Sequence, residues 1–235
     1  MAGARAVHEL VARPNAPHRL YSYGALAVAA LVFAGFARSY YLRAFLSARL
    51  LTPLAHLHGL LMTGWIVLFV TQARLIARRH VALHRRLGVL GAALAAMIVI
   101  VGSLTVAAAI HRRFADAGLA RCGRIFVEFD GLSLGVFGAL VLAAVLGRSR
   151  SDLHKRLMLC ATVALLPPAI GRIAEQLVPA GGWNLLIAAA ATVTFALVCA
   201  AADTLRNGRV HPAMAWGTAA VIAANLLTQL AQAGD

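Results

Sequence analysis

The stretch Leu87–Ile110, LGVLGAALAAMIVIVGSLTVAAAI, contains no charged residue. As an α-helix it would be about 36 Å long, enough to cross the hydrocarbon core of a bilayer, which is about 30 Å thick. Because no water is present in that core, a spanning segment must satisfy its backbone groups within a helix or a closed barrel. The short alternating strands that are typical of membrane barrels do not occur in the sequence. The stretch therefore predicts a transmembrane helix.

Further charge-free runs occur at Leu20–Ala37, Gly182–Ala202 and Pro212–Gly234. The chain of 235 residues is 61% hydrophobic and 13% charged, whereas about a quarter of the residues in a soluble domain are charged. The predicted fold class is all-α, a polytopic helical membrane bundle, with residues 1–19 as a cytoplasmic tail and 20–235 as a single integral membrane domain. We expect about seven membrane-spanning helices, near residues 20–38, 54–76, 87–110, 125–147, 157–178, 182–203 and 212–232.

The distribution of basic residues predicts how the chain is oriented. Fourteen of them lie in the N-terminal tail and in the connections near 74–86, 148–156 and 206–209, against eight on the other side. Since the side richer in Lys and Arg faces the cytoplasm, we expect a multi-pass inner-membrane protein with a cytoplasmic N-terminus and an extracytoplasmic C-terminus. The net charge is +14, but no basic segment is long or interleaved with aromatic residues. The expected partner is therefore the lipid bilayer and not nucleic acid.

One five-residue phrase occurs twice in the chain. Leu83–Leu87 reads LHRRL, and Leu153–Leu157 reads LHKRL. Both copies fall on predicted cytoplasmic connections and open a new helix, so helices two–three and four–five are candidates for a parallel duplication. Convergence is the alternative, because basic residues at helix ends extend toward lipid headgroups wherever helices end at that surface. Both interpretations stay open at the level of sequence.

The histidines of the repeated phrase are candidate ligands of a cofactor. A heme b in a helical bundle needs imidazoles that project from facing helices, and His84 and His154 occupy equivalent positions on the third and fifth predicted helices. The basic residues that follow each histidine are expected to meet the heme propionates, and a heme protein of this kind would need a redox partner. The alternative is that both histidines contact lipid phosphate or a helix end at the interface.

A second group of ionisable residues lies at the predicted outer ends of helices two, four and five. Ionisable groups at membrane depth are costly and often functional. We expect His58 and Glu128, which have the same spacing in the sequence as the two copies of the phrase, as metal ligands. A polar site for a small-molecule ligand, as in a transporter or binding protein, would comprise His56, Asp130, Arg172 and Glu175. Mutual ion pairing, such as Arg172 with Glu175, is the structural alternative.

Helical geometry limits and sharpens this second prediction. His56 and His58 lie about 200° apart around a helix, so only one of them can face the bundle interior. We expect His58 to face inward, because Trp65 and Gln72 continue the same stripe. Pro167-Pro168 must disturb the fifth helix, since proline lacks a backbone N–H. A broken helix beside charged residues is typical of transporters.

Two stretches resemble a known group of proteins. Residues 56–88, HLHGLLMTGWIVLFVTQARLIARRHVALHRRLG, and 152–173, DLHKRLMLCATVALLPPAIGRI, look like uncharacterised bacterial multi-pass membrane proteins with L-H-R-x-L-G and H-K-R-L-M phrases. This resemblance spans roughly residues 55–178 and implies a helical inner-membrane protein without implying an activity. A looser likeness is to the b561-type cytochromes, which hold two hemes by histidines on four helices. This chain has Glu128 and Asp130 where the outer heme would need a histidine, so the likeness implies one heme at most.

Three classes of function follow from these patterns. The first is a histidine-dependent heme or metal redox membrane protein, the second a transporter or small-molecule binder, and the third a structural membrane subunit without a site. Motifs of soluble enzymes, such as a phosphate-binding glycine loop, G-x-S-x-G or H-E-x-x-H, do not occur in the sequence.

Overall fold

The computed structural model describes residues 16–46, 51–114, 120–178 and 183–233, and the side chains at 21–46, 51–109, 111, 131–178 and 183–231. In this described part the chain forms helices and no strand. In chain order they are α2 (Ala16–Phe36), the π-helix η1 (Ala37–Tyr41), α3 (Arg43–Leu46), α4 (Pro53–Ala77), α5 (Val81–Phe114), α6 (Ala120–Leu146), α7 (Ser151–Ala164), α8 (Pro167–Leu177), α9 (Asn184–Asn207) and α10 (Pro212–Ala233).

The predicted all-α membrane bundle is confirmed. Within the described residues, six helical segments are long and apolar enough to cross a bilayer: 21–41, 53–77, 81–109, 151–177, 184–207 and 212–231. The remaining predicted span corresponds to α6, whose residues Gly131–Leu146 form a shorter apolar helix and whose earlier side chains lie outside the described part. The chain is therefore an integral membrane protein. The tail predicted at 1–19 falls mostly outside the described residues, and α2 begins at Ala16.

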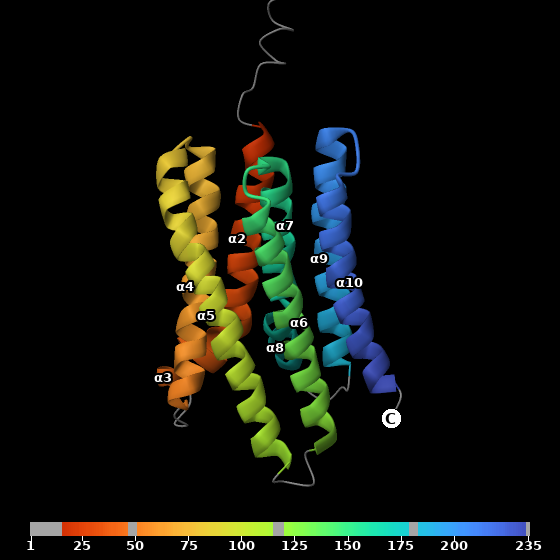
Figure 1. Ribbon diagram of the computed structural model, residues 1–235. Coiled ribbons are helices and arrows are strands. Elements are labelled where there is room, and N and C mark those ends of the chain that lie inside the picture. The colour runs from red at the N-terminus through yellow and green to blue at the C-terminus, as the bar shows by residue number, and fades with distance from the viewer. Residues whose placement is uncertain (1–15, 47–50, 115–119, 179–182, 234–235) are drawn as a thin grey trace, which may run out of the picture.

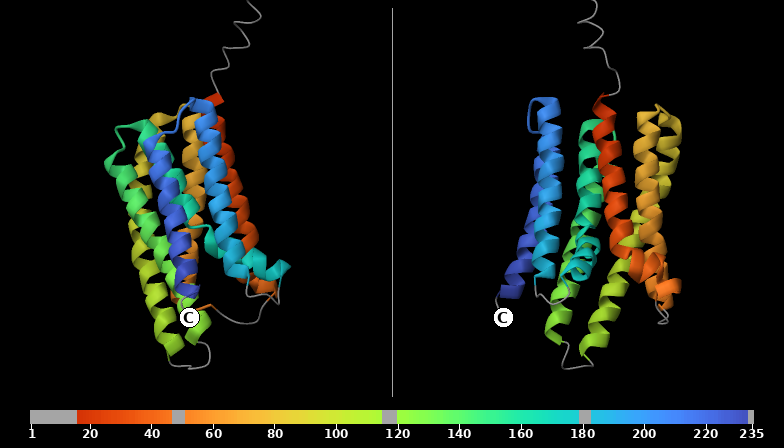
Figure 2. Two further views of the ribbon diagram at one scale, coloured as in Figure 1. Left: turned by 90° about the vertical axis from the view of Figure 1, so that its right-hand side faces the viewer. Right: turned by 180° about the vertical axis from the view of Figure 1, so that it is seen from behind.

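The long helices lie side by side along one axis (Figures 1 and 2). The turns α4–α5, α6–α7 and α9–α10 lie together at the upper end in Figure 1, and we call this the basic end because it contains Arg78, Arg148 and Arg209. α2 begins at the basic end and α10 finishes at the opposite end. The hairpins α4–α5 and α6–α7 run in the same direction, and α5 and α7 begin at equivalent positions of the repeat, Val81 and Ser151. This arrangement agrees with the predicted parallel duplication.

The predicted break at Pro167-Pro168 is present and lies in the core of the bundle. α7 ends at Ala164 and α8 begins at Pro167, because a proline cannot donate a helical hydrogen bond and its ring clashes with the preceding turn. The side chain of Leu166, in the break, is fully buried. From α4, the predicted inward residue Trp65 packs edge-on against Phe137 of α6, with ring centroids 4.9 Å apart. The segment α7–α8 is thus held inside the bundle.

Candidate functional site

The two histidines of the repeated phrase face each other at the basic end. His84 is the fourth residue of α5 and His154 the fourth residue of α7. Their ring centroids are 6.3 Å apart, and the ring planes are inclined by 83°. They meet although α5 and α7 are not among the closely packed helix pairs of the described chain. The structure therefore brings together the two residues that the sequence predicts as ligands of one cofactor.

A hydrogen bond determines which nitrogen of His154 is protonated. Its Nδ1 lies 2.9 Å from the backbone oxygen of Ala144, one of the carbonyl groups in the last turn of α6. Such terminal carbonyl groups lack a partner within their own helix. Because a carbonyl oxygen can only accept, Nδ1 must donate, and in the neutral ring Nε2 then has a free lone pair. A backbone carbonyl in this role orients an imidazole for coordination through the other nitrogen.

The surroundings of His84 leave polar atoms without partners. Its Nδ1 is buried and has no hydrogen-bond partner in the part of the chain that the structure describes. Gln72 of α4 donates from Nε2 to the His84 backbone oxygen at 3.2 Å, while the Gln72 Oε1 atom is buried without a partner in the same described region. A buried polar atom that lacks a hydrogen bond costs about 1–3 kcal/mol. A ligand that pairs with these two atoms would therefore stabilise the surroundings of His84.

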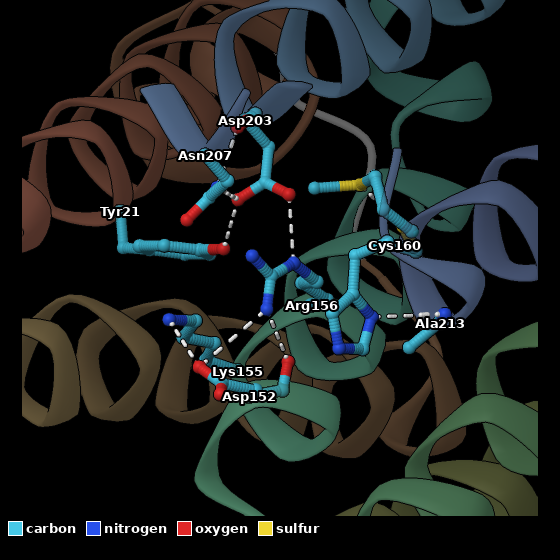
Figure 3. A network of polar contacts seen from close by, with 10 residues as sticks. Tyr21, Asp152, Lys155, Arg156, Cys160, Asp203, Asn207 and Ala213 are labelled. Atoms are coloured by element: carbon cyan, nitrogen blue, oxygen red, sulfur yellow. Dashed lines mark hydrogen bonds and ion pairs between the residues drawn. The ribbon is translucent and has the colours of Figure 1, made fainter. Parts of the chain in front are cut away.

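The second copy of the phrase also forms a buried ion pair that does not follow from the sequence pattern. Arg156 of α7 places its Nε atom 2.7 Å from Oδ2 of Asp203 on α9, and both side chains are only 2% exposed. The Tyr21 hydroxyl of α2 donates to Oδ1 of Asp203 at 2.8 Å, and Asn207 Nδ2 donates to the same oxygen at 3.0 Å. Figure 3 shows how these side chains converge on Asp203 from three helices. The carboxylate and the guanidinium therefore satisfy each other away from water.

One signal in the sequence could have identified this ion pair. Asp203 directly follows the apolar run that ends at Ala202, inside a predicted membrane helix. A carboxylate in such a place predicts a cationic partner. The partner itself could not be predicted, because Arg156 has the same sequence context as Arg86, which is exposed.

The outer edge of this network lies at the surface of the basic end. Asp152 Oδ1 accepts from Lys155 Nζ at 2.9 Å, and its backbone oxygen accepts from Arg156 Nη1 at 2.8 Å. His211 precedes α10, and its Nδ1 accepts from the backbone N–H of Ala213 at 3.1 Å. Partial burial, and next the charge of Arg156, lower the pKa of His211. His211 therefore caps the start of α10 in its neutral form.

These contacts change the expectation for the basic residues of the phrase. Arg85 and Arg86 are exposed next to His84 and remain available to an anionic group. Lys155 and Arg156, which the sequence predicts as partners of the same group, are engaged by Asp152 and Asp203. The two copies therefore do not present equivalent cations, and the propionates of a heme would be met from the first copy.

Part of the predicted outer site is also assembled. His58 of α4 is half-buried, its Nδ1 is buried without a partner among the described residues, and its ring lies against Gly102 of α5. Arg172 of α8 lies within electrostatic range of His58. It donates from Nη1 to the Pro168 backbone oxygen at 2.9 Å and covers the ring of Phe36 at 4.5 Å from the centroid. His58 thus faces inward, as predicted.

The other residues predicted for this site lie on the surface or outside the described part. His56 is exposed and packs beside Tyr40, with ring centroids 6.0 Å apart, so it points away from His58. Glu175 is exposed on α8. The side chains of Glu128 and Asp130 lie outside the described residues, so the predicted pairing of His58 with Glu128 stays a prediction.

Among the residues with described side chains, no group of three or more His, Cys, Asp or Glu is placed to hold a metal ion. No family model matches the chain, and neither a curated protein nor a solved structure matches it.

Proposed function

We propose that the chain is a membrane redox protein that binds one heme b between His84 and His154. The observation that supports this proposal is the 6.3 Å separation of the two imidazole centroids. At this separation each of the two imidazoles could supply one nitrogen to the iron of a single heme, which would carry out one-electron chemistry there.

The number of donors favours a heme over a metal ion without a macrocycle. Protein sites for zinc, iron or copper generally use three or four side-chain ligands. At the basic end His84 and His154 converge, and no larger donor group forms among the described side chains. Two axial ligands are sufficient for a heme, because the macrocycle supplies the other four nitrogens.

Residues of the chain are placed to bind both the iron and the propionates of a heme. The Ala144 carbonyl holds His154 with its Nε2 lone pair free, and the buried Nδ1 of His84 lacks a partner among the described residues. Arg85 and Arg86 place two exposed cations beside His84 for the anionic propionates. A bound heme supplies one-electron transfer, and the protein sets its orientation and surroundings.

An absorption spectrum of the purified protein tests the proposal. We expect detergent-solubilised protein from heme-supplemented cells to show a Soret band and sharp reduced α and β bands, with one heme per chain. His84→Ala and His154→Ala should each remove the bound heme or convert it to a five-coordinate form. His80→Ala is the matched control, because His80 is exposed in the adjacent α4–α5 turn and should leave the spectrum unchanged.

Two results would contradict the proposal. The first is a protein that remains colourless after heme supplementation and after titration with hemin. The second is an equal loss of heme in the His80 and His84 variants, which would show non-specific binding. Either result would turn attention to His58 and Arg172 at the outer site as a place for a small-molecule ligand.

A further inference from the structure

A small polar cavity lies at the basic end, on the α9–α10 side of the bundle. It is lined by Asp152, Arg156, Asn207, Arg209 and His211, and its volume is about 120 Å³. One water needs roughly 10–15 Å³ by this kind of measure, so the cavity has room for a small ion together with water. We call it the Arg156 pocket.

Arg156 is fixed at the wall of this pocket with donors to spare. A guanidinium has five N–H donors, of which Nε bonds to Asp203 and one Nη1 hydrogen bonds to the Asp152 backbone oxygen. The Nη2 group has no hydrogen bond to any residue that the structure describes. Because Asp203 is itself held by Tyr21, the guanidinium cannot turn away from the pocket. The side chain is only 2% exposed and lines the pocket, so its remaining N–H donors can reach an acceptor that is bound there.

The other lining residues add donors and positive charge. Since Nδ1 of His211 accepts the Ala213 N–H, the proton of the neutral ring is on Nε2, which is then a donor. The same contact places the pocket at the start of α10, where the helix dipole favours an anion. Arg209 is exposed and contributes a second guanidinium.

The acidic residues nearby do not cancel this charge. Asp203 is paired with Arg156 at 2.7 Å, and Asp152 is paired with Lys155 at 2.9 Å and with Arg156 at 3.6 Å, so two carboxylates face the two cations Lys155 and Arg156. Among the described residues that line the pocket, Arg209 is left as the uncompensated charge. We propose that the Arg156 pocket binds a phosphate-type oxyanion, through Arg156, Arg209 and the Nε2–H of His211. The oxyanion is either free phosphate or the phosphate of a lipid headgroup, since the pocket lies at the membrane surface.

Calorimetric titration of the delipidated full-length protein in detergent with inorganic phosphate tests this proposal. We expect saturable binding of one phosphate per chain, weakened at high salt. Arg209→Gln should weaken binding by at least about tenfold, because it removes a charge-assisted hydrogen bond. His211→Gln should weaken it less. Arg78→Gln is the matched control, because Arg78 is exposed at the same end of the bundle in the α4–α5 turn. Arg156 itself is not substituted, since its loss would also break the ion pair with Asp203.

A second titration in the presence of phosphatidylglycerol distinguishes the two sources. If the natural occupant is a lipid headgroup, the lipid will compete with inorganic phosphate, and native mass spectrometry will show lipid retained by the wild type and lost from Arg209→Gln. If the occupant is free phosphate, the lipid will leave the titration unchanged. The proposal is overturned if neither phosphate nor lipid binds, or if Arg78→Gln weakens binding as much as Arg209→Gln.

Discussion

The two copies of the repeated phrase differ in their surroundings more than in their sequence. In the first copy, His84 lies beside a Gln72 oxygen that has no partner among the described residues, and exposed arginines follow it. In the second copy, His154 is bonded to a helix-terminal carbonyl, and Arg156 is buried against Asp203. The two histidines lie next to each other, whereas Arg86 is exposed and Arg156 is buried. The repeated sequence therefore predicts that equivalent residues lie at the same end of the bundle. Their burial and their hydrogen-bond partners depend on the neighbouring helices.

Helix geometry explains part of this difference. In the first copy, the residue equivalent to Ala144 is Arg74, and its carbonyl accepts the backbone N–H of Arg78, so it has no need of the histidine. In the second copy, the Ala144 oxygen accepts from the His154 ring. The position of each helix in the bundle explains the remaining difference between the two arginines. In the most apolar stretch of α7–α8, 72% of the residues are buried, whereas in that of α5 only 22% are. A cation near the start of a central helix finds protein around it, and one on a peripheral helix finds solvent or headgroups.

Neutralising the equivalent arginines is the strongest test of this comparison. Arg156→Gln should lower the free energy of unfolding by about 3–5 kcal/mol, because it leaves the buried Asp203 carboxylate without its counter-ion. Arg86→Gln, in the first copy, should change the same quantity by less than about 0.5 kcal/mol, because that side chain is exposed. Unfolding in mixed micelles of mild detergent and dodecyl sulfate measures both.

A double variant separates the lost charge pair from lost packing. Replacing both partners, in Arg156→Met with Asp203→Leu, should recover most of the stability, because a buried ion pair can be replaced by apolar groups at little cost. Equal effects of Arg156→Gln and Arg86→Gln would show that the two copies have equivalent environments in the membrane, and the comparison would fail.

A smaller effect is expected from the tyrosine that supports the ion pair. Tyr21→Phe removes the hydroxyl that donates to Asp203 at 2.8 Å and should cost about 1.5–3 kcal/mol, the range for a hydrogen bond to a charged group. Tyr23→Phe is the control in the same helix, because Tyr23 is 64% exposed and its hydroxyl can be replaced at no more than about 0.5 kcal/mol. If the two variants have the same free energy of unfolding, the hydrogen bond from the Tyr21 hydroxyl to Asp203 does not stabilise the ion pair of the second copy.

The fold could be predicted from sequence because the bilayer imposes a simple rule on the chain. A run such as Leu87–Ile110 has only one way to satisfy its backbone groups in hydrocarbon, and the break at Pro167 follows from a missing N–H. The predicted helix ends agree with the observed ones within six residues, since charged residues gather at the turns, and the largest differences are at the starts of α5 and α7, which include the repeated phrase.

The site could be predicted only in part. The meeting of His84 with His154 follows from a repeat whose copies open helices at the same end of the bundle. The ion pair of Arg156 with Asp203 depends on which helices become neighbours, and a helix pattern does not contain that information. The inward position of His58 was predictable from its helical stripe, because Trp65 lies on the same face.

The smallest expected effect is a pH dependence of the free energy of unfolding, which comes from His211 beside the second copy of the phrase. Partial burial and the charge of Arg156 lower the pKa of His211 below its ordinary value of about 6.5, with Arg209 acting in the same direction and Asp152 and Asp203 opposing them. The unfolded chain therefore binds this proton more readily than the folded chain. The contribution of His211 to stability is complete above about pH 6.5 and is lost as the pH falls through the lower folded value. The structural reason is that a protonated Nδ1 cannot accept the Ala213 N–H.

We expect the difference in unfolding free energy between wild type and His211→Gln to be larger at pH 7.5 than at pH 5. A difference that stays constant or grows on acidification would mean that His211 does not cap α10 in its neutral form.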